Sequence, residues 1–148
     1  MMTEVVSPAV PRPVWPAVRN GLRHRCPACG RGRLFSRYLK TVERCADCGE
    51  DLSPQRADDG PAYLTVLIVC HVVGFGLHFL AQNTDLGPGV IALLLSGLAV
   101  PLSLALLPSM KGLMVGVQWA KRMHGFGGDD PHLAPDPHHL PAADEAAR

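Results

Sequence analysis

Charged residues are absent from two long stretches of this sequence. No Asp, Glu, Lys or Arg lies between Asp59 and Asp85, and none lies between Asp85 and Lys111. Crossing the hydrocarbon core of a bilayer takes about 20 apolar residues, and a charge within that core is costly. The missing charge therefore predicts two membrane-spanning helices, at residues 62–81 and 89–107.

A secretory signal is also missing, because the first twenty residues contain no apolar segment behind a basic one. We therefore expect the amino terminus to stay on the side of the membrane where it is made. Of the 14 Lys and Arg residues, 10 precede the first predicted span, 4 follow the second, and none lies in the connecting residues 82–88. This asymmetry predicts that both termini are cytoplasmic.

The residue sets that most enzymes need are missing as well. The sequence has no Ser-His-Asp arrangement, no Gly-rich phosphate loop and no pair of carboxylates placed for a cavity. Asp58 and Asp59 are adjacent at a predicted helix start, so their side chains point in different directions. We therefore expect a protein without enzymatic activity.

What is present divides the chain into five regions. Residues 1–20 are rich in proline and have no apolar period, so we predict that they are disordered. Residues 22–56 carry four cysteines, and residues 61–107 form the predicted hairpin of two spans. Residues 109–124 have a polar and an apolar side, which predicts a cytoplasmic amphipathic helix on the membrane surface. Residues 125–148, rich in Pro, Gly and acid, are predicted to be a disordered tail.

Two copies of Cys-x2-Cys-Gly predict a metal site. Two residues between thiolates let one tight turn present both sulfurs to a tetrahedral ion, and the following Gly tolerates the positive φ of such a turn. Four thiolates complete the coordination sphere, so we predict a structural zinc ion, with iron as the alternative. The predicted ligands are Cys26, Cys29, Cys45 and Cys48. The predicted fold is an all-α membrane protein, a two-span transmembrane helical hairpin with a small N-terminal cytoplasmic zinc ribbon of four cysteines.

Basic residues lie among apolar and aromatic ones between the two cysteine pairs. Such a mixture can hold nucleic acid phosphates or face anionic lipid head groups. Because the ribbon is tethered close to the bilayer, we expect lipid contact or plain solvation, with nucleic acid as the lesser alternative. The basic residues are Arg31, Arg33, Arg37, Lys40 and Arg44.

The first span carries a polar stripe with three side chains that bind metals and haem, Cys70, His71 and His78. We expect this stripe to pack against small residues of the second span, with His71 bonded to Ser96 or Ser103. The alternative is a haem or copper site, because ionisable groups within a membrane mark functional sites. The two histidines are separated by about 10 Å along the helix, so one small ion cannot contact both. Within the second span, Pro101 predicts a kink.

Three strings hold the most distinctive residues: CPACGRGRLFSRYLK, CADCGEDLSPQRADDGPAYLTVLIVCHVVG and LLPSMKGLMVGVQWAKRMHGFG. Together, within residues 22–126, they resemble a bacterial membrane family known as domain of unknown function 983. The resemblance implies a multi-pass protein of the bacterial inner (cytoplasmic) membrane. In α-proteobacteria, members of that family often look like part of the gene neighbourhood of haem-copper cytochrome oxidase and its assembly factors, and the resemblance therefore implies a respiratory partner.

We therefore expect a membrane-embedded accessory or assembly factor that binds another membrane protein, with cytochrome oxidase maturation as the most specific form. A second interpretation is a haem or copper handling protein that uses Cys70, His71 and His78. A third is a membrane-tethered regulator whose ribbon binds nucleic acid. Homo-oligomers are compatible with all three interpretations.

Overall fold

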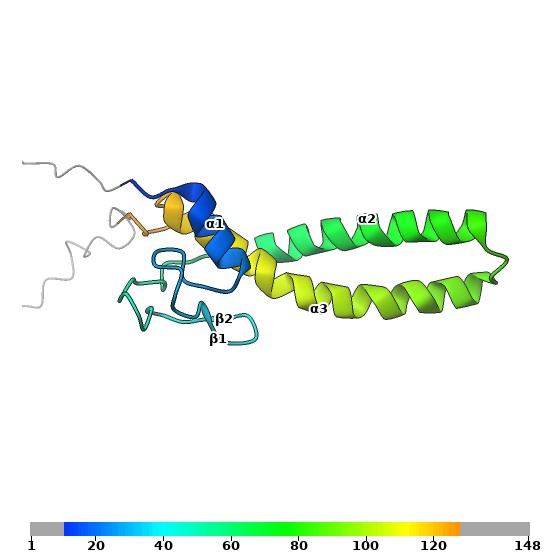
Figure 1. Cartoon of the computed structure of the whole chain (residues 1–148), viewed down its shortest axis with the longest axis horizontal. Coiled ribbons are helices and arrows are strands. Elements are labelled where there is room, and N and C mark those ends of the chain that lie inside the picture. Colours follow the sequence, from blue (N-terminus) through cyan, green and yellow to red (C-terminus); the bar gives the residue numbers. More distant parts are fainter. Residues whose placement is uncertain (1–10, 128–148) are drawn as a thin grey trace, which may run out of the picture.

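The computed structural model describes residues 11–127, and helices make up most of its regular structure. Two long helices, α2 (Gly60–Asn83) and α3 (Pro88–Ala120), run side by side in opposite directions (Figure 1). At one end of this hairpin lies a smaller body, which we call the cysteine domain. It consists of α1 (Val14–Leu22), residues 23–59 with the two-stranded sheet, and the last turns of α3 from Pro108 onward.

Helices α2 and α3 have the length and composition of membrane spans. Their 24 and 33 residues contain one charged side chain between them, Lys111. In each helix only 11% of the most apolar 18-residue window is buried inside the protein. The central helix of a soluble domain would be mostly buried, so these helices lack the protein cover that such a helix has. Both are therefore long and apolar enough to cross a membrane.

Proline at the first positions starts both long helices. Pro61 and Pro88 stand in the first turn, where a missing N–H costs no helical hydrogen bond. Between the helices, the Thr84 hydroxyl donates to the carbonyl of Leu80 at 2.7 Å and completes the end of α2. The short connection that follows requires the two helices to run antiparallel.

Helix α1 corrects the prediction that residues 1–20 are disordered. Residues 14–20 belong to this helix, and residues 1–10 lie outside the described part of the chain. Two prolines surround its start, Pro13 before the helix and Pro16 in the first turn, where neither removes a helical hydrogen bond. The helix is stabilised by tertiary packing of Ala17 and Gly21. The prediction of disorder rested on the proline content and did not take this packing into account.

The end of α3 corrects a second prediction. Residues 109–120 are not a separate helix on the membrane surface but the last turns of α3, in the middle of the cysteine domain. Val115 is completely buried, and Phe126, in the turns after the helix, is 6% exposed. The predicted tail 125–148 therefore begins inside the core, and its residues from 128 onward lie outside the described part. The core cluster comprises Ala17, Leu34, Leu52, Ala57, Val115, Trp119, Ala120 and Phe126.

The sheet of the cysteine domain is a small antiparallel hairpin. Strands β1 (Phe35–Arg37) and β2 (Lys40–Thr41) pair with Phe35 opposite Thr41. Their turn contains Leu39, whose φ of 60° lies in the left-handed region. The turn reaches along the long axis to about the level at which α2 begins (Figure 1).

Two prolines lie within α3, and the helix continues through both. We predicted the kink at Pro101, but Figure 1 shows the axis of α3 turning in its yellow part, which contains Pro108. Pro108 has no N–H to donate to the carbonyl of Leu104, four residues earlier. The hydroxyl of Tyr38 donates to that carbonyl instead, at 2.8 Å. The β1–β2 turn therefore supplies the hydrogen bond that the proline removes.

Candidate metal centre

Each cysteine pair lies in a tight turn of the same construction. The N–H of Gly30 donates to the carbonyl of Cys26 at 2.9 Å, and that of Gly49 to the carbonyl of Cys45 at 3.0 Å. Both glycines have positive φ, 68° and 73°, which they adopt without the strain of a side chain. An isolated antiparallel bridge flanks each turn, Arg25 with Arg33 and Arg44 with Asp51. The two turns are thereby held as matching halves of one site.

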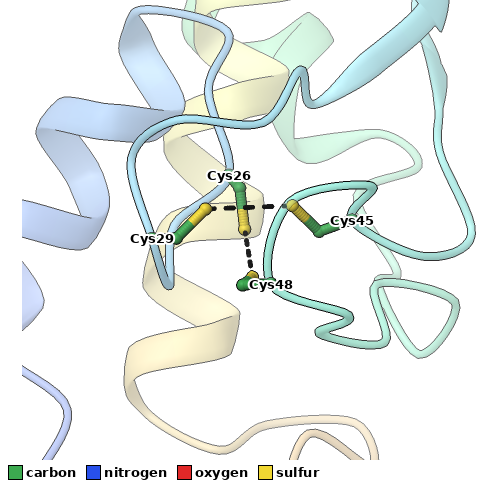
Figure 2. Close-up of side chains that lie close together, drawn as sticks. All are labelled: Cys26, Cys29, Cys45 and Cys48. Atoms are coloured by element: carbon green, nitrogen blue, oxygen red, sulfur yellow. Dashed lines mark hydrogen bonds between the residues drawn. The ribbon is translucent and has the colours of Figure 1, made fainter.

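The four sulfurs meet between these turns (Figure 2). All four lie within 4.8 Å of one another, and the Cys26–Cys48 and Cys29–Cys45 sulfur distances are both 3.8 Å. A tetrahedral zinc ion with Zn–S bonds of about 2.3 Å separates its sulfurs by about 3.8 Å. Disulfides require sulfurs about 2.05 Å apart. The cluster therefore has the dimensions of a four-cysteine metal site, and its cysteines could bind a metal such as zinc.

The thiols of the cluster differ in acidity. Burial raises the pKa of Cys26 and that of Cys48 above their usual value. Burial also raises the pKa of Cys29, but hydrogen bonds from the backbone N–H groups of Gly32 and Arg31 and with the thiols of Cys48 and Cys45 together outweigh it and lower the pKa to about 7. At neutral pH the metal-free cluster therefore keeps protons on Cys26 and Cys48. A metal ion must displace those protons when it binds.

Gly32 is a part of this site that the sequence motif did not reveal. Its carbonyl accepts the N–H of Cys26 at 2.8 Å, and a Cβ placed on it would collide with the sulfur of Cys45. Only glycine leaves room for the second cysteine pair at this position. The signal in the sequence is the second glycine of CGRG, two residues after the Gly that closes the turn.

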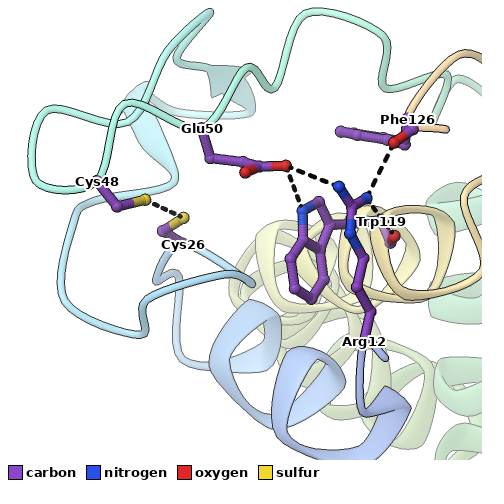
Figure 3. A network of polar contacts seen from close by, with 6 residues as sticks. All are labelled: Arg12, Cys26, Cys48, Glu50, Trp119 and Phe126. Carbon is purple, nitrogen blue, oxygen red and sulfur yellow. Dashed lines mark hydrogen bonds and ion pairs between the residues drawn. The ribbon is translucent and has the colours of Figure 1, made fainter. Parts of the chain in front are cut away.

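A polar network connects the second cysteine turn to the end of α3 (Figure 3). Glu50, two residues after Cys48, accepts the indole N–H of Trp119 at 2.7 Å. Arg12 lies over the Trp119 ring, 4.6 Å from its centroid, and forms an ion pair of 3.4 Å with Glu50. The same guanidinium donates to the carbonyls of Trp119 and Phe126 at 3.1 and 3.0 Å. Residues from the two ends of the described chain are thereby joined at the metal site.

Three further contacts attach the segment around the cysteines to α3. The buried side-chain amide of Gln118 bonds both backbone groups of Arg56, accepting at 3.0 Å and donating at 2.8 Å. Lys111 donates to the carbonyl of Leu39 at 2.9 Å. The ring of His24 and the hydroxyl of Ser109 lie 3.1 Å apart. The segment around the cysteines therefore packs against α3, which holds it at several points along the helix.

Small residues let α1 approach α3 as closely as backbones allow. Ala17 and Gly21 are spaced four apart on α1, and Gly112 and Gly116 on α3. A Cβ added to Gly112 would overlap the backbone of Gly21, and one on Gly116 would lie 2.6 Å from the carbonyl oxygen of Ala17. This small-x3-small pattern on both helices is typical of close helix pairs. It is a signal in the sequence that our prediction of a disordered start overlooked.

The family model described as Protein of unknown function (DUF983) matches residues 35–119. The chain belongs to this family. The matched residues include the second cysteine pair, all of α2 and all of α3 except its last residue, and the first pair, Cys26 and Cys29, precedes them. Among curated proteins no match was found, and none was found among solved structures.

The third string that resembles DUF983 contains three residue pairs with structural roles in this chain, Leu107-Pro108, Lys111-Gly112 and Gln118-Trp119. Pro108 leaves the carbonyl of Leu104 without a helical N–H partner, and Tyr38 donates to that carbonyl. Lys111 donates to the carbonyl of Leu39 in the turn of the β hairpin. Gln118 and Trp119 bond residues that follow the second cysteine pair. These pairs therefore join the last turns of α3 to the rest of the cysteine domain.

The three candidate residues of the first span lie on the outside of α2. Cys70, His71 and His78 are exposed, whereas Thr65 and Val69 on the opposite side of the helix are buried against α3. His71 donates from Nδ1 to the carbonyl of Leu67 at 2.7 Å, and Ser103 bonds the carbonyl of Ala99 in its own helix. The predicted contact of the stripe with the second span is therefore wrong. Helical periodicity groups residues on one face but does not say which neighbour that face meets.

Proposed function

We propose that this protein is an integral membrane accessory protein that binds a helix of another membrane protein through the outer face of α2. Its cysteine domain is a zinc ribbon on the cytoplasmic side of a bacterial inner membrane, with both termini on that side. The proposal has a structural part, the ribbon on α3, and a binding part, the face of α2.

The zinc part is supported by the geometry of the four sulfurs and by the size of the domain. The described residues before α2 are too few to bury a large core of their own, and chains of this size usually need a metal or disulfides to fold. Zinc contributes about 10 kcal/mol or more to folding in small Cys-rich peptides. Four thiolates leave no open coordination position, so the ion stabilises the domain and takes no part in catalysis.

The polar stripe of α2 is the observation on which the binding part depends. Cys70, His71, Gly74 and His78 line a shallow groove of about 380 Å³ together with Phe75. His71 stands at the middle of the 24 residues of α2, the level of the centre of a bilayer. A charged side chain at that depth costs about 3 kcal/mol or more against lipid, and a neutral polar side chain without a hydrogen-bond partner is also unfavourable there. A protein helix that covers the stripe and donates a hydrogen bond to Nε2 of His71 removes that cost.

The most specific form of the proposal takes the partner to be a subunit of a respiratory complex of the cytochrome oxidase type. It is supported by the resemblance to a family whose genes often look like part of the gene neighbourhood of that enzyme. Deleting the gene should lower the amount of assembled haem-copper oxidase in membranes, measured by its optical spectrum. An unchanged spectrum would contradict this form and leave the zinc ribbon and the stripe unaffected.

The binding part is tested by pull-down of the tagged full chain from native membranes in a mild detergent. We expect an oxidase subunit with the wild type, and its loss when His71 and His78 are both replaced by Leu. The matched control is Phe79→Leu, which changes an exposed residue of α2 outside the groove. Equal capture by all three proteins would contradict binding through the stripe, and recovery of only a second copy of the chain would replace the heterologous partner with a homo-oligomer.

A second candidate function is haem or copper handling, which the grouping of Cys70, His71 and His78 in one groove favours. Because Nδ1 of His71 donates to the carbonyl of Leu67, its Nε2 keeps the lone pair that a metal ligand needs. This candidate predicts haem absorption or bound copper in the purified protein, in addition to zinc. A colourless preparation that holds one zinc ion per chain and no other metal would eliminate it.

A further inference from the structure

We propose that the cysteine domain binds the phosphate of an anionic phospholipid head group in an arginine-lined basin beside the entry of α3 into the membrane. The basin has a volume of about 700 Å³, within the range of ligand sites in proteins. Five arginines from three segments line it, and no Asp or Glu does. They are Arg23, Arg25, Arg31, Arg33 and Arg37.

The arginines of the basin are left without carboxylate partners. None of the five guanidinium groups forms an ion pair with an acid of residues 11–127, and the one side-chain bond found among them joins Arg25 to the carbonyl of Gly30. Arg25 and Arg33 are moreover direct partners in an antiparallel bridge. Like charges opposite each other across two strands destabilise the pairing. An anion bound between the two guanidinium groups would replace their mutual repulsion with attraction of both to the anion.

Two residues in the lining of the basin have a strained backbone conformation. His24 and Leu39, both in its lining, have φ values of 61° and 60°, a conformation that L residues rarely adopt. Such strain gathers at ligand sites, where the surrounding contacts maintain it. His24 is held by Ser109, and Leu39 by Lys111, at 3.1 and 2.9 Å. Helix α3 therefore fixes the shape of the basin from one side.

A lipid, rather than a soluble phosphate, is favoured by where the basin lies. Pro108, Tyr38 and Leu39 form its apolar edge, and the Tyr38 hydroxyl bonds the carbonyl of Leu104 in the apolar part of α3. This inference rests on the proposed membrane location of α2 and α3. In that setting the edge meets the head-group region, and the guanidinium forks match phosphate oxygens in pairs. Acyl chains would then lie along α3 while the phosphate lies among the arginines.

The test is native mass spectrometry of the full chain in a neutral detergent, titrated with phosphatidylglycerol or phosphatidylcholine. The basin variant replaces Arg23, Arg33 and Arg37 by Gln. The control variant removes the same charge outside the basin, by replacing Arg19, Arg44 and Arg56 with Gln. Zinc content is measured on every sample, so that a misfolded cysteine domain is recognised and the single-residue variants are used in its place.

We expect wild type to bind the first phosphatidylglycerol at least about tenfold more tightly than phosphatidylcholine, because each basic group near the surface adds to anionic binding. The basin variant should lose this preference, and the control should keep it within about threefold. Equal loss in both variants would show general charge attraction and overturn the proposal. Displacement of the lipid by glycerol phosphate or by a single-stranded oligonucleotide at equal concentration would also overturn it, in favour of a soluble phosphate or nucleic acid. Normal zinc content with no lipid preference would refute the basin alone and leave the proposed accessory function standing.

Discussion

Replacing Gly112 by Ala tests the contact between α1 and α3 most severely. The added methyl would overlap the backbone of Gly21, which cannot move aside as a flexible side chain can. The helices must then separate and give up the packing of Ala17 and Val115, both completely buried. Overpacking of a tight core costs about 1–3 kcal/mol, and we expect the upper end because backbone meets backbone.

The readout for this variant is the tryptophan fluorescence of the detergent-solubilised full chain during heating. The chain has 2 tryptophans, Trp15 on α1 and Trp119 at the end of α3, so the signal reports on the cysteine domain. A loss of about 3 kcal/mol lowers the midpoint by more than about 10 °C in a domain of this size. Gly97→Ala is the control, because nothing lies within 4 Å of the added methyl. An unchanged midpoint for Gly112→Ala would refute the close approach of the two helices.

The remaining predictions concern the metal site and its attachment. Cys45→Ser should abolish stoichiometric zinc and the cooperative fluorescence transition, as checked by metal analysis and heating; full zinc content would contradict the four-cysteine site. Gln118→Met should lower stability by about 2–4 kcal/mol, since two backbone groups of Arg56 lose their partner, and an unchanged midpoint would show that water replaces the amide. Because Cys26 and Cys48 have raised pKa values, zinc must release at least two protons near neutral pH. Lowering the pH by one unit should therefore weaken zinc binding at least about 100-fold in a chelator competition, and a clearly smaller change would contradict these protonation states.

The sequence predicted the elements whose signals are local. Missing charge marked α2 and α3, and the repeated Cys-x2-Cys-Gly marked the cluster, because bilayer thickness and a tetrahedral ion each impose a spacing along the chain. It did not predict α1, since prolines suggested disorder while its stability comes from contacts with glycines about 90 residues later in the chain. Packing partners that are distant in sequence leave only a faint small-x3-small pattern.

Two other predictions failed because periodicity does not identify a neighbour. The apolar face of residues 109–120 meets the core of the cysteine domain, and lipid would have produced the same pattern. The polar stripe with His71 and His78 forms one face, as expected, but that face is turned away from α3. The direction of residues 109–120 is set by their contacts with the rest of the cysteine domain, which include the bonds of Lys111, Gln118 and Trp119.

Photo-crosslinking inside the membrane tests the central claim, that the outer face of α2 contacts another protein. A photoreactive residue is placed at His71 or His78 in the full chain, and at Phe79 as an exposed control outside the groove. We predict that irradiation of cells yields a protein adduct from positions 71 and 78 and only lipid adducts from position 79. Lipid adducts alone from all three positions would contradict the account.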